Sequence, residues 1–175
     1  MKSAAQNLPN ILTWLRIFAV PFFLWACIHK SQFAVVIFIM CAITDGIDGW
    51  LARQLKAQSV FGAYLDPIAD KLLCNTALLW IVYESKNLWI LSCVCILVFR
   101  DVIISYIRSN FRDVPVSKLA KLKSVILFFA IVCLLQAIVW HSVLVYQLGF
   151  MLLFVSTCLS LWTFVSYTSS NIDNH

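Results

Sequence analysis

Four aspartates lie close together in the sequence and form two closely spaced pairs. Asp45 and Asp48 are three positions apart. After a short interval, Asp66 and Asp70 are four positions apart. In a helix, either spacing places the two carboxylates of a pair on one face. Four carboxylates that converge in a low-dielectric site repel one another strongly, and hard divalent cations such as Mg²⁺ or Mn²⁺ relieve that repulsion. The pattern therefore predicts a divalent-metal site.

Three small residues share the helical faces of these carboxylates. They are Gly49 and Ala52 in the first segment and Gly62 in the second. Small residues at these positions leave room for a flat or bulky group to approach the backbone. Small residues also let membrane helices pack closely, so a packing explanation stays open for each of them.

The aspartates also have purely structural explanations. Asp45 and Asp48 could belong to a solvated loop between two helices, because two glycines in this stretch weaken its helix propensity. Asp66 precedes Pro67 and could be the N-cap of a helix that begins with proline. For the whole set to be structural, all of the spacings would have to coincide by accident. We therefore favour the metal site.

The composition indicates what kind of element must position these residues. Of the 175 residues, 62% are hydrophobic and 12% are charged, whereas a soluble domain carries roughly 45–50% apolar and about 25% charged residues. Six bilayer-spanning helices of about 20 residues need about 120 apolar-dominated positions, and 62% of 175 is about 108. This excludes a water-soluble globular enzyme and a disordered chain. We predict an all-α polytopic membrane protein.

Six apolar stretches separated by short polar breaks can be marked along the chain. They cover residues 10–29, 33–55, 59–83, 87–109, 118–140 and 143–168. Short breaks make neighbouring helices antiparallel. Pro9 and Asn10 could cap the first helix, and Ser169–His175 is a short polar end. Because the sequence shows no internal repeat and no second domain, residues 1–175 are expected to form one membrane domain.

The distribution of lysine and arginine predicts the orientation of these helices, because cytoplasmic loops carry the excess of both residues. With the N-terminus inside, the cytoplasmic side holds Lys2, Arg53, Lys56, Arg108, Arg112, Lys118, Lys121 and Lys123. The opposite side holds only Lys30 and Lys86. Both termini are therefore expected inside. The first helix begins almost at once and no cleavable leader is apparent, so a bacterial inner membrane is the expected location.

Eight charged residues fall within or at the ends of the apolar stretches. They are Arg16, Asp45, Asp48, Asp66, Asp70, Lys71, Arg100 and Asp101. Each would cost about 2.5–3.5 kcal/mol at the centre of a lipid-facing helix, so we expect them to face a common polar cavity toward the cytoplasmic half. Their formal charge is −2 (five acids, three bases), and two divalent cations would change it to +2, which suits a diphosphate.

The run Asp45-x2-Asp48-Gly49-x2-Ala52-Arg53-x8-Gly62-x3-Asp66-x3-Asp70 resembles the full signature of the CDP-alcohol phosphatidyltransferases. The six-helix plan is also similar to that family. The resemblance implies an enzyme that moves a phosphatidyl group from CDP-diacylglycerol to an alcohol and releases CMP. It also implies two bound divalent cations, Mg²⁺ or Mn²⁺, and a homodimer.

Carried onto this sequence, the resemblance implies a role for every fixed position. The implied metal ligands are Asp45, Asp48 and Asp66, with Asp70 near or bound to the second ion. Asp70 would be the base that takes the proton from the acceptor hydroxyl. The implied CDP site consists of Asp48, Gly49, Ala52, Arg53, Gly62 and Asp66, with Arg53 on the diphosphate.

Five basic residues are candidates for binding the acceptor alcohol: Arg16, Arg100, Arg108, Lys121 and Lys123. Such a cluster suits an acceptor that carries its own phosphate, such as glycerol 3-phosphate. The excess of basic residues at cytoplasmic helix ends could by itself explain Arg108 and Lys121. Arg16 could instead extend to the lipid headgroups, and Arg100 could pair locally with Asp101.

The acceptor itself has two candidates within the family. Lys121-Leu-Lys123-Ser124 resembles the Lys-x-Lys-Thr of members that use glycerol 3-phosphate. Arg100-Asp101 is closer to members of the cardiolipin synthase type, which use phosphatidylglycerol, since the glycerophosphate enzymes usually have Arg-Glu there. We favour glycerol 3-phosphate.

Other classes of protein fit the sequence less well. Membrane prenyltransferases need two aspartate-rich motifs and more helices than this chain can supply. A divalent-cation carrier has no use for Arg53 or for a basic rim. No basic run is long enough to bind nucleic acid. The seven cysteines lie in apolar stretches and are expected to be small buried hydrophobic residues.

Overall fold

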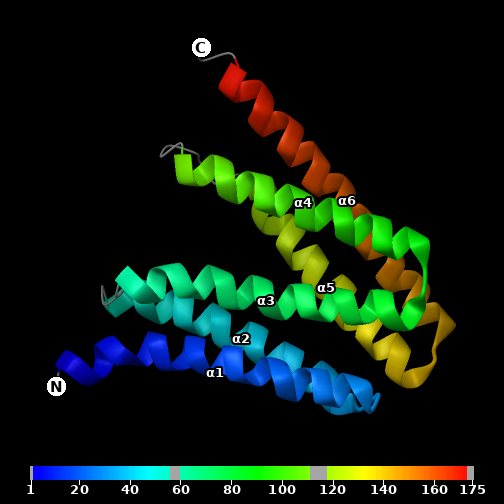
Figure 1. Cartoon of the computed structure of the whole chain (residues 1–175), viewed down its shortest axis with the longest axis horizontal. Helices are drawn as coiled ribbons and strands as arrows, with labels where there is room; N and C mark the ends of the chain where they lie inside the picture. Colours follow the sequence, from blue (N-terminus) through cyan, green and yellow to red (C-terminus); the bar gives the residue numbers. More distant parts are fainter. Residues whose placement is uncertain (1, 56–59, 111–117, 173–175) are drawn as a thin grey trace. The chain divides into compact units, whose positions relative to one another are not determined.

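In its described residues, the computed structural model of the chain contains six α-helices connected in sequence (Figure 1). It describes the backbone of residues 2–55, 60–110 and 118–172, and the side chains of residues 14–44, 71–104 and 122–165. The helices are α1 (Lys2–Ile28), α2 (Gln32–Leu55), α3 (Val60–Ser85), α4 (Leu88–Asn110), α5 (Lys118–Trp140) and α6 (Val143–Ile172). The prediction of an all-α fold with six helices is confirmed.

Two helix boundaries differ from the sequence prediction. Helix α1 begins at Lys2 and continues through Pro9, because the residues before the proline, including Ala4 and Ala5, are good helix formers. Pro9 and Asn10 therefore do not cap the helix. Helix α6 continues to Ile172, several residues into what was predicted to be a polar tail. Hydropathy marks where a chain leaves an apolar medium, and a helix can continue beyond that point.

The chain forms two compact units, residues 1–80 and 81–175. In the first unit α1 packs against α2. Their contact contains buried Phe23 and Phe38, whose ring centroids are 6.2 Å apart, and the small buried residues Ala26 and Ala34. These alanines lie close to the turn between the helices, where the two backbones converge.

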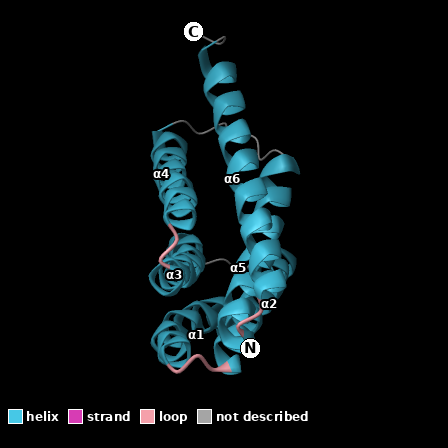
Figure 2. Cartoon of the chain, turned by 90° about the vertical axis from the view of Figure 1, so that its right-hand side faces the viewer, coloured by secondary structure: helices cyan, strands magenta, loops and turns pink. Residues whose placement is uncertain are grey.

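In the second unit α6 packs against both α5 and α4, and α5 and α6 lie side by side in both views (Figure 2). The α5–α6 contact is tightest at Gly149. A Cβ atom added there would lie 2.8 Å from Leu134 Cγ and 3.0 Å from the Leu134 backbone nitrogen. Leu134 is completely buried. Gly149 therefore sets how closely these two helices approach.

Three of the connections are tight turns with a left-handed residue that is not glycine. The φ angles are 47° at Lys30, 49° at Lys86 and 51° at His141. At the end of α1, the Ser31 N–H donates to the carbonyl oxygen of Ala26 and the Lys30 N–H donates to that of Cys27. This is the Schellman pattern, and it satisfies two of the last helical carbonyl groups.

Large apolar side chains cover the surface of the helices. Phe22, Phe99, Leu144 and Met151 are all more than half exposed. The segments Leu122–Trp140 and Val143–Val165 are long and apolar enough to cross a bilayer, and shorter apolar helices cover Trp14–Ile28 and Gln32–Thr44. Because soluble monomers do not expose apolar surface continuously on this scale, the chain is a membrane protein.

The cysteines follow the same pattern. Cys27, Cys41 and Cys93 are buried and Cys74 and Cys133 are partly exposed, while Cys95 and Cys158 are exposed. The prediction that all seven are buried is therefore wrong for the last two. An apolar medium around the helices accepts a thiol at the surface as readily as the protein core does.

Candidate active site

The backbone of the aspartate motif is helical on both sides of the connection between α2 and α3. Helix α2 continues without a break through Asp45 and Asp48 to Leu55, so these two aspartates do not lie in a loop. Asp66 lies inside α3, which begins at Val60, so it is not an N-cap. Both structural alternatives for the motif are therefore wrong at the level of the backbone.

The continuous helices fix which motif residues share a face. Asp45 and Asp48 are one turn apart on α2, and Asp66 and Asp70 are one turn apart on α3. Gly49 and Ala52 continue the α2 face, and Gly62 continues the α3 face. The side chains of these residues and of Arg53 lie outside the described part, so their proposed contacts with metal and CDP remain predictions.

Arg16 is buried in the first unit. Only 2% of its surface is exposed. The guanidinium therefore does not reach the surface, and the alternative in which it extends to the headgroups is wrong. A buried arginine beside an apolar helix is consistent with the predicted polar interior.

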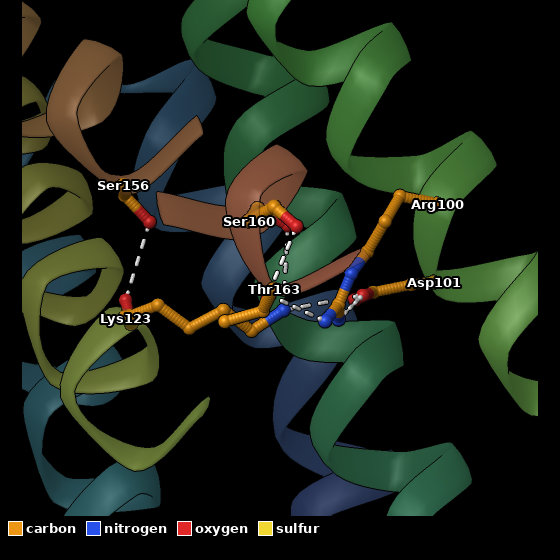
Figure 3. A network of polar contacts seen from close by, with 6 residues as sticks. All are labelled: Arg100, Asp101, Lys123, Ser156, Ser160 and Thr163. Atoms are coloured by element: carbon orange, nitrogen blue, oxygen red, sulfur yellow. Dashed lines mark hydrogen bonds and ion pairs between the residues drawn. The ribbon is translucent and has the colours of Figure 1, made fainter. Parts of the chain in front are cut away.

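In the second unit, α4, α5 and α6 contribute to one polar cluster (Figure 3). The Nη1 atom of Arg100 donates to Oδ1 of Asp101 at 2.9 Å. The Nζ atom of Lys123 lies 3.6 Å from the same carboxylate oxygen. The side chains of Arg100 and Lys123 are 9% and 12% exposed, and that of Asp101 is 42% exposed. The local pair between Arg100 and Asp101, which was the structural alternative to an acceptor-binding role for Arg100, is present, and the carboxylate also bridges to a cation on another helix.

Hydroxyl groups on α6 complete this cluster, and the sequence prediction did not include them. Thr163 Oγ1 accepts a bond from Arg100 Nη2 at 3.1 Å, and Ser160 Oγ accepts one from Lys123 Nζ at 3.4 Å. Ser156 Oγ donates to the backbone carbonyl oxygen of Lys123 at 3.2 Å. A usable signal was present, since positions 156, 160 and 163 place three hydroxyls on one face of a largely apolar helix.

The remaining predicted residues are only partly described. Arg108 belongs to α4 and Lys121 to α5, but the described side chains do not include them. Lys71, on α3, is exposed. The structure thus brings Arg100 and Lys123 together and leaves the contacts of Arg108 and Lys121 as predictions.

A model of the family described as CDP-alcohol phosphatidyltransferase matches residues 6–162. The chain belongs to this family. The family resemblance drawn from the aspartate motif is thereby confirmed. The matched region contains that motif together with Arg16, Arg100, Lys123 and Ser160, and it extends over parts of both compact units.

Several bacterial relatives of this CDP-alcohol phosphatidyltransferase are similar over nearly their whole length. One from Wigglesworthia glossinidia brevipalpis is 34% identical over 171 residues, which covers 92% of each chain. Others from Shigella flexneri serotype 5b and Escherichia coli K12 are 33% identical over 175 residues, which covers 94% of each chain. All three are named CDP-diacylglycerol–glycerol-3-phosphate 3-phosphatidyltransferase.

The donor chemistry of the motif fits a hard divalent cation. Its four acidic residues supply only carboxylate oxygens, which Mg²⁺ and Mn²⁺ prefer, and no cysteine or histidine lies among the fixed positions. Among the described side chains there is no group of three or more histidine, cysteine, aspartate or glutamate residues that could hold a metal ion. The motif therefore supplies donor atoms that fit a divalent cation.

Proposed function

We propose that the protein transfers a phosphatidyl group from CDP-diacylglycerol to sn-glycerol 3-phosphate, giving phosphatidylglycerophosphate and CMP. The strongest support is the similarity to bacterial relatives that are named CDP-diacylglycerol–glycerol-3-phosphate 3-phosphatidyltransferase. Their sequences are 33–34% identical to this chain over 92–94% of the length of each protein. Family membership supports the donor and the type of reaction. The buried Arg100 and the largely enclosed Lys123 support an anionic acceptor.

In the proposed reaction, the acceptor hydroxyl oxygen forms a bond to the phosphorus of the lipid. The bond from that phosphorus to the bridging oxygen breaks, and CMP leaves with the electron pair. Asp70 takes the proton of the hydroxyl group. Arg53 binds the diphosphate, and Gly49, Ala52 and Gly62 leave space for the nucleotide.

Asp45, Asp48, Asp66 and Asp70 would together hold two divalent cations, Mg²⁺ or Mn²⁺. When bound, these ions would neutralise negative charge on the phosphates during the transfer. The carboxylates also orient the CDP group through Asp48 and Asp66.

The acceptor site would contain Arg16, Arg100, Arg108, Lys121 and Lys123. Arginine binds a phosphate with two parallel hydrogen bonds, while lysine contributes a compact positive charge. A buried cation discriminates against a neutral alcohol, because only an anionic ligand offsets the free energy of desolvating that cation. Glycerol 3-phosphate meets this requirement, and serine and inositol do not carry the phosphate.

We further propose that all six helices cross a bacterial inner membrane, with both termini and the active site toward the cytoplasm. The excess of basic residues on one side supports this orientation. Because the family model spans both compact units, we propose that residues 1–175 work as one catalytic domain. A homodimer follows from the family resemblance.

A direct test offers purified protein CDP-diacylglycerol and Mn²⁺ with one acceptor at a time: glycerol 3-phosphate, phosphatidylglycerol, serine or inositol. The lipid product and CMP are both measured. We expect phosphatidylglycerophosphate from glycerol 3-phosphate alone. Product from phosphatidylglycerol alone would instead establish the second candidate, a cardiolipin synthase, which the Arg100-Asp101 sequence favours.

A substitution in the metal site separates the enzyme from a cation carrier. Asp45→Asn should abolish CMP release, while Thr157→Val, which changes a residue of α6 outside the motif, should leave it intact. Cation uptake into proteoliposomes by a protein that forms no CMP would overturn the proposed function.

A further inference from the structure

Arg100 has more hydrogen-bond donors than its partners among the described side chains use. A guanidinium has five N–H donors. Among the described residues, one donor of Nη1 has Asp101 as its partner and one of Nη2 has Thr163, while the buried Nε has none. Since the Arg100 side chain is only 9% exposed, bulk water has little access to the remaining donors. Arg100 therefore has N–H donors available for a bound ligand.

Thr163 fixes how those donors are presented. Its own proton is committed, because Oγ1 donates to the carbonyl oxygen of Ser160 at 2.9 Å. The lone pairs of Oγ1 are thereby left for Arg100 Nη2 at 3.1 Å. Since Asp101 holds Nη1 at the same time, both Nη atoms of the planar guanidinium are held.

The same helix also positions the second cation. Ser160 Oγ lies 3.4 Å from Lys123 Nζ, and the Lys123 ammonium group shares Asp101 with Arg100. Two cations from α4 and α5 are thus set by neighbouring hydroxyls on α6 (Figure 3). If the hydroxyls of Ser160 and Thr163 served only to hold the helices together, neutral partners would be sufficient. Their partners are instead the charged groups of Lys123 and Arg100.

We propose that Thr163 is a positioning residue for the acceptor, which holds Arg100 in the orientation that binds the phosphate of glycerol 3-phosphate. This inference rests on the proposed function and adds a specific role for α6. Thr163 itself need not touch the acceptor. Its contribution is to fix the guanidinium before the phosphate arrives, so that less conformational freedom is lost on binding.

Helix α6 offers a matched control for this proposal. Thr157 is also a buried threonine of α6, and its Oγ1 donates to the carbonyl oxygen of Leu153 in the same helix. Its side chain also interacts with the thiol of Cys93 on α4, and none of its described contacts involves Arg100 or Lys123. Thr163→Val and Thr157→Val each replace a hydroxyl by a methyl group of similar size. They differ in that only the first removes an acceptor from Arg100. Thr163→Ser keeps that acceptor.

The experiment measures the KM for each substrate separately in the purified variants. Because a hydrogen bond to a charged group is involved, we expect Thr163→Val to raise the KM for glycerol 3-phosphate about tenfold. The KM for CDP-diacylglycerol and kcat should change by less than about twofold, the pattern of lost acceptor binding. Thr163→Ser should restore most of the loss, and Thr157→Val should resemble the wild type.

A second measurement does not depend on turnover. Glycerol 3-phosphate should raise the thermal unfolding temperature of the wild type and of Thr157→Val, and much less that of Thr163→Val. If Thr163→Val does not fold, Thr163→Ala, which also lacks the hydroxyl, is measured in its place.

The possible outcomes separate this inference from the proposed function. If the wild type converts glycerol 3-phosphate and Thr163→Val has an unchanged KM for it, the inference is wrong and the function stands. An equal rise in both KM values would likewise show a merely structural role. If the wild type makes no phosphatidylglycerophosphate but glycerol 3-phosphate stabilises it and not Thr163→Val, the proposed function is wrong, and only the part of the inference in which Thr163 positions Arg100 to bind glycerol 3-phosphate stands.

Discussion

The close contact at Gly149 allows a quantitative prediction about the α5–α6 pair. In Gly149→Ala, the new methyl carbon would lie 2.8 Å from Leu134 Cγ, 3.0 Å from Leu134 Cδ2 and 3.0 Å from the Leu134 backbone nitrogen. Attractive contacts between carbon atoms lie near 3.5–4.0 Å, so the overlap is about 0.5–1 Å. Leu134 is fully buried and one of the three atoms is backbone, so a side-chain rotation alone cannot relieve the overlap.

The expected cost follows from two opposing terms. Overpacking of a core by one methyl group costs about 1–3 kcal/mol, and the backbone contact favours the upper part of that range. Replacing glycine by alanine inside a helix returns roughly 0.8–1 kcal/mol. We therefore expect Gly149→Ala to lower the free energy of unfolding by about 1–2 kcal/mol, which corresponds to a decrease in Tm of roughly 2–8 °C for a chain of this size.

Thermal unfolding in detergent measures this change, with Leu148→Ala as the control because that neighbouring side chain is exposed. In a Gly149→Ala/Leu134→Ala double variant, the smaller side chain relieves part of the overlap, so the two effects should be non-additive by about 0.5–3 kcal/mol. A Tm for Gly149→Ala equal to or above that of the wild type would refute the reasoning, as would strict additivity.

Three further predictions concern the turns and the metal site. Lys30→Gly should raise the free energy of unfolding by about 0.5–1 kcal/mol, because glycine adopts the left-handed conformation of Lys30 without steric cost; a lower Tm would show that the lysine side chain itself stabilises the turn. Asp70→Asn should lose turnover while keeping much of the affinity for CDP-diacylglycerol, measured by equilibrium binding; complete loss of binding would indicate that Asp70 is chiefly a metal ligand. Removal of divalent cations with a chelator should stop CMP release, and added Mg²⁺ or Mn²⁺ should restore it; activity that persists in excess chelator would contradict the metal site.

Local features of the fold were predictable because hydropathy and spacing are local properties. The six apolar stretches correspond to six helices, and Arg100 and Asp101, adjacent in sequence, form the local pair that was one of the two alternatives for Arg100. The start of α1 was not predictable in this way. From the sequence alone, a proline near the start of an apolar stretch can be either the first residue of a helix or a residue inside it, and in α1 Pro9 lies inside the helix.

The contacts of the α6 hydroxyls could not be predicted from the sequence. Thr163 lies 63 positions from Arg100, and Ser160 lies 37 positions from Lys123. No periodicity within α6 reveals which of its faces meets α4 or α5, because both contacts depend on tertiary packing. The cations were predictable as charges in apolar segments, and the spacing of the hydroxyls on α6 was visible in the sequence, but which cation each hydroxyl meets was not.

The tight turns at Lys30 and His141 join α1 to α2 and α5 to α6, and in each of these pairs the two helices pack against each other. Each turn links helices that follow one another directly in the chain, so each hairpin can close soon after its own residues have been synthesised. The first hairpin carries Asp45 and Asp48, whereas Asp66 and Asp70 lie on α3. A nascent chain that ends after the first hairpin thus has only half of the carboxylates of the motif. The complete set exists only once α3 has been made.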